Sequence, residues 1–313
     1  MGNRGCSSPN CKIQLGNIPF NLIFDTVAGI GISANTFVLL FYISTILLDH
    51  KTKLHDLITC HLAFVHIVML LIPVEFFFPD MFQSLNFLND FKCKALFYTQ
   101  KVMRGLSICT TCLLSILQVI TISPSTSWMA KFKHKFTHYR ILGLFGFFWS
   151  INLSFSSDMI IYAVAYSNTT QKNLLNISKY CSLSPMNVIL RGLFLTLSLS
   201  RDITFVGLML LSSAYMVILL CRHQRRLQYL HSTSFSTRAS PEKRATQSIL
   251  LLVSCFVFMY SLEIILSSST SMLWVFGPVI FSVYRFVVNV YATVSPLLLI
   301  RSDKRIITIL QKF

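Results

Sequence analysis

Long apolar stretches separated by short polar segments dominate the chain, and they set the first expectation about its fold. A helix needs about 20 mostly apolar residues to cross a lipid bilayer. Seven stretches reach that length, approximately at residues 20–48, 56–78, 93–122, 141–165, 190–221, 245–267 and 276–300. We therefore predict an all-α membrane protein, a single domain over residues 1–313 that folds as a bundle of seven transmembrane helices.

The composition supports a membrane protein. Of the 313 residues, 54% are hydrophobic and only 12% are charged, about half the charged share of a typical soluble domain. The 27 Lys and Arg residues outnumber the 11 acidic residues. In a soluble protein this balance would suggest nucleic acid, but cytoplasmic loops of membrane proteins also collect basic residues, and no nucleic-acid-binding motif is present. We expect membrane lipid as a partner and no nucleic acid.

The distribution of the basic residues predicts the orientation of the chain. Sixteen of the 27 lie in alternate loops and in the tail, at residues 49–55, 123–140, 222–244 and 301–313. Because basic loops face the cytoplasm, this set is predicted to be cytoplasmic. The N-terminus is then extracellular and the C-terminus cytoplasmic.

Two kinds of residue on the predicted outer side agree with this orientation. Asn168 and Asn176 each begin an N-glycosylation sequence in the loop between the fourth and fifth spans. Cys93 opens the third span on the oxidising side and Cys181 lies in the next outer loop, so these two cysteines could form a disulfide. Cys6 and Cys11 in the N-terminal arm could pair with each other.

Sequence patterns of catalysis and metal binding are weak. The chain contains no P-loop, no His-Glu-x-x-His and no Gly-x-Ser-x-Gly sequence. Cys109 and Cys112 lie in an apolar stretch without a second cysteine pair, which favours packing over metal binding. His134 and His138 lie in a Lys-rich loop, where contact with anionic lipid headgroups is the simpler interpretation. We expect no enzymatic activity, no catalytic residue, no metal and no other cofactor.

Ionisable residues at membrane depth are the candidate binding residues, because charges there are costly and mark function by default. Lys101 and Arg104 lie 8 and 11 residues after the start of the third span, about 12 and 17 Å deep on one helix face. Arg285 lies at a comparable depth in the seventh span. Glu75 and Glu263 are the acidic residues placed to neutralise them. Structural pairing and ligand contact are equally compatible with this pattern.

The surroundings of these cations predict a class of ligand. Arg201 and Asp202 are adjacent, so we expect them to point to different faces, each with a partner on another helix. Aromatic residues occur around the cations, and an apolar pocket with a few cations suits a small apolar molecule that carries an acidic group. Arg104 is the first choice for a bidentate contact. The candidate ligand-binding residues are Lys101, Arg104, Glu263, Tyr284 and Arg285.

Several longer strings narrow the function. The run LSILQVITISP at residues 114–124, followed by AKFKHK at residues 130–135, resembles the end of the third span and the second inner loop of vomeronasal type 1 receptors. Further strings resemble the same family in its later spans, at residues 200–203, 205–209, 240–246, 249–254 and 291–296. The resemblance extends over most of the chain, from the first span to the tail.

The resemblance implies a chemosensory G-protein-coupled receptor. Such a receptor lies in the plasma membrane of sensory neurons, binds a small pheromone-like molecule from outside and activates a heterotrimeric G protein of the Gi/o class. Two alternatives stay open. A bitter-taste-like receptor is the nearest one among receptors, and tissue expression would separate the two. A small-solute transporter would require paired broken helices and a polar path through the membrane, which the sequence does not show.

Some positions depart from rhodopsin-like receptors. Gln118 stands where those receptors carry the arginine of Asp-Arg-Tyr, and His66 stands where they carry a sodium-binding Asp. We therefore expect neither the usual arginine lock nor the usual sodium site. Gln118, Arg225 and Arg226 are the candidate G-protein contacts, with residues 222–226 extending the fifth span as a helix. Alternatively, the two arginines only belong to the excess of basic residues that orients cytoplasmic loops and do not contact the G protein.

Overall fold

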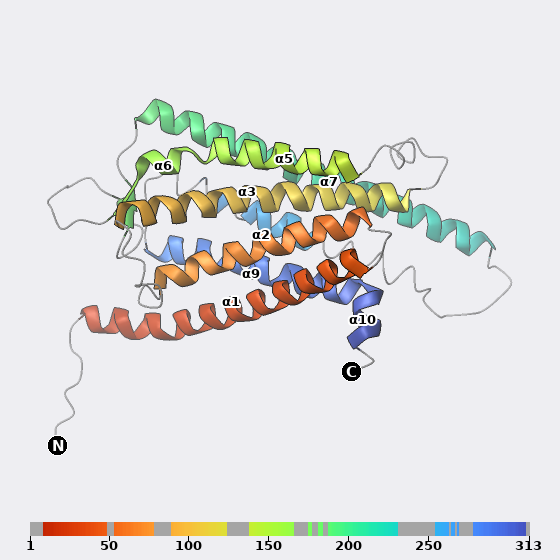
Figure 1. The fold of residues 1–313 in the computed structure, drawn as a ribbon, viewed down its shortest axis with the longest axis horizontal. Coiled ribbons are helices and arrows are strands. Elements are labelled where there is room, and N and C mark those ends of the chain that lie inside the picture. The colour runs from red at the N-terminus through yellow and green to blue at the C-terminus, as the bar shows by residue number, and fades with distance from the viewer. Residues whose placement is uncertain are drawn as a thin grey trace, which may run out of the picture.

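The computed structural model describes eleven segments of the chain: residues 9–48, 53–77, 89–123, 138–165, 175–176, 181–183, 187–230, 254–262, 264–266, 268 and 278–310. Its helices are α1 (Pro9–Leu48), α2 (Leu54–Phe77), α3 (Asn89–Ile122), α5 (His138–Phe155), α6 (Asp158–Tyr162), α7 (Val188–Leu230), α9 (Pro278–Ser302) and α10 (Lys304–Leu310). Three short strands are β1 (Ala163–Ala165), β2 (Leu175–Asn176) and β3 (Cys181–Leu183). The long helices lie side by side in a bundle, and α10 turns across one end of it (Figure 1).

Several of these helices are suited to crossing a membrane. Five stretches are long and apolar enough, at Asp25–Leu48, Leu54–Ile72, Phe91–Ile122, Tyr139–Tyr162 and Val188–Leu219. Two shorter apolar helices occupy Ser254–Leu266 and Phe286–Arg301. The expectation of an almost entirely helical membrane protein is therefore confirmed. The count of seven spans and the orientation of the termini stay predictions.

Helix α3 forms the centre of the bundle. It contacts α2, α5, α6, α7 and β1, and 83% of its apolar stretch is buried, against 22% for α1. Leu106, Cys109 and Leu113 of α3 belong to the main hydrophobic core. Large apolar side chains such as Leu47 and Leu211 are exposed instead, as expected for surfaces that face lipid.

The fourth predicted span is divided in the structure. Helix α5 ends at Phe155, and α6 begins at Asp158 after a turn at Ser156 and Ser157. The hydroxyl of Ser157 donates to the carbonyl of Ser154 over 2.8 Å. Serine side chains that bond to nearby backbone groups compete with helical hydrogen bonding, which explains a break in an otherwise apolar stretch.

A small antiparallel sheet follows α6. Strand β3 lies between β1 and β2, with Ala165 opposite Cys181 and Asn176 opposite Ser182. Because β1 also contacts α3, the sheet holds the segment around Cys181 beside the bundle. The contact places α3, α6 and β3 in one region of the molecule.

Helices α1 and α9 approach each other closely through a glycine and an asparagine. The amide of Asn35 donates to the carbonyl of Gly31 over 2.8 Å and to that of Ala292 over 2.9 Å. A Cβ atom at Gly31 would lie 2.3 Å from the hydroxyl oxygen of Thr293, so only glycine permits this approach. The hydroxyl of Thr293 donates in turn to the carbonyl of Val27. These bonds satisfy polar groups inside an apolar bundle, where unpaired ones would be costly.

Candidate functional site

Two of the predicted cations are paired with carboxylates inside the bundle. The ammonium of Lys101 lies 2.6 and 2.8 Å from the two carboxylate oxygens of Asp158, the first residue of α6. The Nη2 atom of Arg104 lies 2.6 Å from an oxygen of Asp202 in α7. Arg104 and Asp202 are buried, whereas the side chain of Lys101 keeps 17% of its surface exposed. Ion pairs therefore join α3 to α6 and to α7.

A third cation completes this group. The Nε atom of Arg201 donates to Asp202 over 2.8 Å, and its Nη1 atom donates to the side-chain carbonyl of Asn152 over 2.6 Å. The expectation that Arg201 and Asp202 cannot face each other was wrong, because the long arginine side chain curls back over its neighbour. The expectation that each also has a partner on another helix is confirmed, with Asn152 on α5 and Arg104 on α3.

We call these six residues the charge cluster: Lys101, Arg104, Asn152, Asp158, Arg201 and Asp202. Its three cations and two carboxylates leave one excess positive charge among the described side chains. Arg104, Arg201 and Asp202 are buried, so removal of Asp202 would take a carboxylate from two buried cations, whereas the pair of Lys101 and Asp158 is partly exposed through Lys101. Sequence reasoning missed Asp158 as a partner. Its position within an apolar stretch was the available signal.

A glycine makes the charge cluster possible. A Cβ atom at Gly105 would lie 1.8 Å from the side-chain oxygen of Asn152 and 2.6 Å from the Nη1 atom of Arg201. The two side chains therefore rest directly on the backbone of α3. No other residue type leaves this space, so Gly105 is a positioning residue for the cluster.

A second polar group lies one helical turn further along α3. The hydroxyl of Ser107 lies 2.8 Å from the Nε2 atom of His66 and 2.8 Å from the hydroxyl of Tyr260. The hydroxyl of Tyr291 lies 3.1 Å from those of Ser107 and Thr111. All five side chains are buried. We call His66, Ser107, Thr111, Tyr260 and Tyr291 the hydroxyl cluster; it ties together α2, α3, residues 254–262 and α9.

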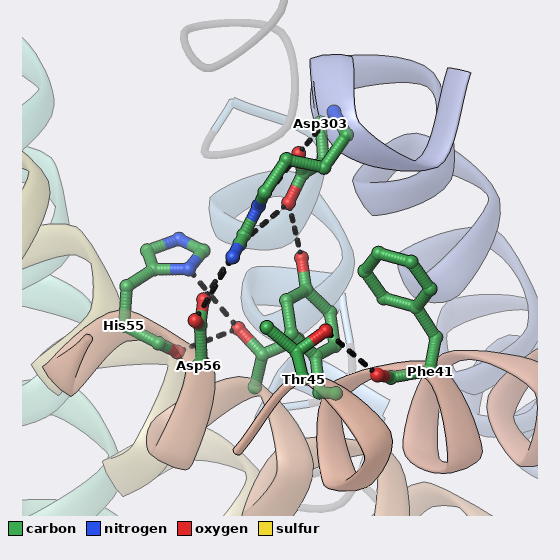
Figure 2. Close-up of polar contacts among 8 residues, drawn as sticks. Phe41, Thr45, His55, Asp56 and Asp303 are labelled. Carbon is green, nitrogen blue, oxygen red and sulfur yellow. Dashed lines mark hydrogen bonds and ion pairs between the residues drawn. The ribbon is translucent and has the colours of Figure 1, made fainter. Parts of the chain in front are cut away.

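A third polar group lies at the α10 end of the bundle (Figure 2). Arg305 binds both carboxylate oxygens of Asp56, over 2.7 and 3.0 Å, and also binds Asp303 over 2.9 Å. The hydroxyl of Tyr42 donates to Asp303 over 2.8 Å. We call these four residues the α10 cluster; it joins α1, α2 and the junction between α9 and α10.

Hydrogen bonding sets the charge state of the α10 cluster. Burial raises the pKa of Asp303, but bonds from the side chain and backbone of Arg305 and from Tyr42 outweigh burial and hold that pKa below its usual value. The bonds to Asp56 raise the pKa of Arg305 despite its partial burial. The backbone N–H of Arg305 donates to Asp303 over 2.8 Å, so the same carboxylate caps the first turn of α10.

Comparison with known proteins decides the family. The sequence model of the vomeronasal organ pheromone receptor family matches residues 19–312. The chain belongs to this family. It is 44% identical to vomeronasal type-1 receptor 90 of Rattus norvegicus over 93% of each chain. It is also 39% identical to vomeronasal type-1 receptor 45 of Mus musculus, over 93% of this chain and 90% of the relative. The chain is thus a multi-pass membrane protein of a receptor class.

The structure of this vomeronasal receptor family member places only part of the predicted outer site. Lys101 and Arg104 lie in the charge cluster. Tyr284 and Arg285 belong to α9, but their side chains lie outside the described residues, as does Glu263 entirely. The charge cluster thus holds two of the five predicted ligand-binding residues, and the structure does not show where the other three side chains lie.

The predicted extracellular features of the vomeronasal receptor chain are likewise described in part. Cys93 is disulfide-bonded, and Cys181 is the first residue of β3. Asn176 ends β2, whereas Asn168 lies outside the described residues. The pairing of Cys93 with Cys181 and the glycosylation of both asparagines stay predictions.

The predicted G-protein contacts of the vomeronasal receptor chain lie near the cytoplasmic ends expected for α3 and α7. Gln118 is buried on α3, with 7% of its surface exposed. Helix α7 continues to Leu230, so the helical extension expected at residues 222–226 is confirmed. Arg225 is exposed there and lines an open hollow with Arg222 and Cys221. The side chain of Arg226 lies outside the described residues.

Proposed function

We propose that this member of the vomeronasal receptor family is a seven-span chemosensory receptor of the plasma membrane, with an extracellular N-terminus and a cytoplasmic C-terminus. It binds a small pheromone-like molecule near the charge cluster and activates a Gi/o-class G protein. The family match supports a receptor over the transporter and enzyme classes. The observation that carries the proposal is a continuous line of buried polar residues that runs along α3 from the charge cluster toward Gln118.

This line follows the helical repeat. Its members are spaced three or four residues apart and therefore lie on one face of α3: Arg104, Ser107, Thr111, Ser115 and Gln118. All five are buried, with between 0 and 7% of their surface exposed. Five polar residues on one buried face of an apolar helix are costly unless they are satisfied or functional. The line connects the region expected to meet ligand with the region expected to meet the G protein.

The charge cluster favours an anionic ligand. Its described residues carry one excess positive charge, and Lys101 is the most exposed of its three cations. An acidic group on a ligand would compete with Asp158 for Lys101, while the planar guanidinium of Arg104 would suit sulfate or carboxylate. We include Glu263, Tyr284 and Arg285 as further ligand contacts. The receptor thus binds a largely apolar molecule with one anionic group.

The remaining assignments complete the proposed receptor. Gln118, Arg225 and Arg226 contact the G protein from α3 and from the extended end of α7. A disulfide between Cys93 and Cys181 fixes the outer loop beside α3, which the contact of β1 with α3 supports. Asn168 and Asn176 in that loop carry N-linked glycans.

A ligand assay on Lys101 variants tests the proposal. Cells would express the receptor with a promiscuous G protein, and a steroid sulfate would be compared with its uncharged parent steroid. Lys101→Gln should lower the potency of the sulfate by roughly tenfold, since a charge-assisted bond to the ligand is lost. Lys101→Arg is the matched control and should retain most of the potency. Equal potency of both steroids in all three receptors would contradict the proposed ligand class.

The same cells test the G-protein assignment separately. Pertussis toxin, which blocks Gi/o proteins, should abolish the response when only endogenous G proteins are present. Replacing Arg225 and Arg226 together by Gln should reduce coupling while ligand potency stays unchanged. An unaltered response after toxin treatment would rule out the Gi/o class. Unaltered coupling in the double variant would show that the two arginines serve only the membrane orientation of the chain.

A further inference from the structure

The last third of α7 carries a hollow on its surface, with a volume of about 250 Å³. The described residues that line this hollow are Val217, Ile218, Cys221, Arg222 and Arg225. Their spacing places them on one face of the helix. All five side chains are exposed, so the hollow opens to the surroundings of the receptor rather than to its core.

The hollow crosses the point where the apolar part of α7 ends. The apolar stretch of this helix ends at Leu219. Val217 and Ile218 lie within the stretch, with 38% and 49% of their surface exposed, and the two arginines follow it. From Val217 to Arg225 the helix rises about 12 Å. Because a spanning helix leaves the hydrocarbon where its apolar stretch ends, the apolar end of the hollow faces acyl chains and its basic end lies at the depth of the phosphate groups.

The two arginines of the hollow lack a carboxylate nearby in the described structure. The ion pairs found among the described side chains involve neither Arg222 nor Arg225. Along the chain, no acidic residue occurs between Asp202 and Glu242. The guanidinium groups lie three residues apart on one helix face, and this planar group forms charge-assisted bonds with phosphate. The basic end of the hollow therefore suits an anion from the surroundings.

We propose that this hollow is a binding site for an anionic phospholipid. The headgroup phosphate binds Arg222 and Arg225, and an acyl chain follows Val217 and Ile218. Basic residues beside a span attract anionic lipids in general, but the hollow adds a defined place in which basic and apolar contacts follow each other in the order of a phospholipid. A soluble phosphate would use only the two arginines. The site goes beyond the proposed function and requires only that α7 crosses the membrane.

The lipid site is compatible with the G-protein contact proposed for Arg225. A guanidinium has five N–H donors, so one arginine can bind a lipid phosphate and a protein side chain together. The two proposals are also independent, because lipid binding can be measured without pheromone or G protein. Failure of one of them leaves the other in place.

The thiol of Cys221 reports directly on occupancy of the hollow, because it is free, exposed and part of the lining. The full chain would be placed in nanodiscs of phosphatidylcholine with rising mole fractions of a phosphatidylinositol bisphosphate. The measured quantity is the rate at which Cys221 reacts with a water-soluble maleimide, followed by mass spectrometry of its peptide. A bound lipid should cover the thiol, so the rate should fall along a saturable curve.

Variants of the basic end test the contact with the headgroup. Arg222→Gln with Arg225→Gln should raise the half-protecting mole fraction by roughly tenfold or more, since each basic residue at the membrane surface contributes about fivefold. Arg222→Lys with Arg225→Lys keeps the charge and should shift the curve less. Arg140→Gln with Arg301→Gln is the matched control, because it removes the same charge from two exposed positions outside the described lining. This control should leave the curve unchanged.

Variants of the apolar end separate a lipid from a free phosphate. Ile218→Ser should weaken the protection of Cys221, whereas Leu211→Ser should not, because Leu211 is exposed on the same helix outside the described lining. Soluble inositol trisphosphate, which carries the headgroup without acyl chains, should protect far less than the lipid. Melting temperatures identify a variant that fails to fold; if the glutamine pair does, the lysine pair and Ile218→Ser decide.

The outcomes either support or overturn the site. Protection that is weakened in the glutamine pair and in Ile218→Ser, and retained in both controls, supports it. No protection at any lipid fraction overturns it. Equal slowing in wild type and in the glutamine pair would reflect general surface charge and would also overturn it, as would an equal shift in Arg140→Gln with Arg301→Gln. Equal protection by the soluble headgroup would replace the lipid by a free phosphate and contradict the proposed occupant.

Discussion

The charge cluster and the α10 cluster use the same chemistry in opposite settings. The charge cluster has three cations and two carboxylates inside the bundle, with Arg104, Arg201 and Asp202 all buried. The α10 cluster has one cation and two carboxylates, and the side chain of Arg305 keeps 34% of its surface exposed. The charge cluster thus has a positive net charge and is largely buried, whereas the α10 cluster has a negative net charge and is partly exposed. Removal of the buried Asp202 from the charge cluster should therefore be severe, whereas removal of a partner in the α10 cluster should be mild.

The largest expected effect is loss of the shared carboxylate of the charge cluster. Asp202 lies between the guanidinium groups of Arg104 and Arg201. Asp202→Ala removes the carboxylate that both buried cations share, and breaking a buried pair costs about 3–5 kcal/mol. We expect loss of the receptor from the cell surface, measured by antibody staining of an N-terminal tag. Asp303→Ala is the matched control in the α10 cluster and should retain most of the receptor at the cell surface. Equal losses of surface receptor in the two variants would contradict the proposed difference between the clusters.

The next effect tests the close approach to α3. Gly105→Ala places a methyl group 1.8 Å from the side-chain oxygen of Asn152, and such overpacking costs about 1–3 kcal/mol. The melting temperature of purified receptor should fall accordingly. Gly143→Ala is the control, because nothing lies within 4 Å of that position. Adding Asn152→Ala to Gly105→Ala should recover part of the loss, and no recovery would place the strain elsewhere.

A smaller effect is expected in the α10 cluster. Arg305→Gln removes a bidentate bond to Asp56 and a bond to Asp303. Because the arginine is partly exposed, we expect a loss of about 1 kcal/mol in stability. The exchange of charges in Asp56→Arg with Arg305→Asp should restore part of it. A loss of stability as large as that expected for Asp202→Ala would show that the α10 cluster is as well shielded from water as the charge cluster.

The smallest effect is a pH dependence at the α10 cluster. The pKa of Asp303 is held below its usual value in the folded receptor, so its ionised form contributes stability above the unfolded pKa of about 3.9. This contribution is lost as pH falls through the lower folded value. Melting temperatures of wild type and Asp303→Asn should therefore converge below about pH 4. A constant difference across the acidic range, from well above that pH to well below it, would contradict the assigned charge state.

The sequence predicted the helices better than their partners. Helix α3 ends at the predicted residue, Ile122, and α2 begins within two residues of the predicted start, because a long apolar stretch is a local property of the chain. The break between α5 and α6 depends on local serine bonds that hydropathy does not register. Helix α10 was not predicted, although Asp303 two residues before Arg305 is a local N-cap signal; only the bonds of Asp303 to Tyr42 and of Arg305 to Asp56 are tertiary.

The partners of the buried charges could not be found from one sequence. Lys101 and Arg104 were identified by depth, but Asp158 and Asp202 became their partners only through the packing of α6 and α7 on α3. The spacing of Ser107, Thr111 and Ser115 on one helix face was visible as a pattern. Its meaning depends on Tyr260 and Tyr291, which come from segments more than 140 residues away.

The potency of an anionic steroid at Asp158→Asn tests the central claim most directly. This change removes the internal competitor for Lys101 and keeps a side chain of the same shape. We predict that a steroid sulfate becomes roughly fivefold more potent, because release of Lys101 from its partly exposed ion pair contributes about 1 kcal/mol. The uncharged parent steroid should gain nothing. An equal change for both steroids, or a loss for the sulfate, would contradict an anionic ligand at the charge cluster.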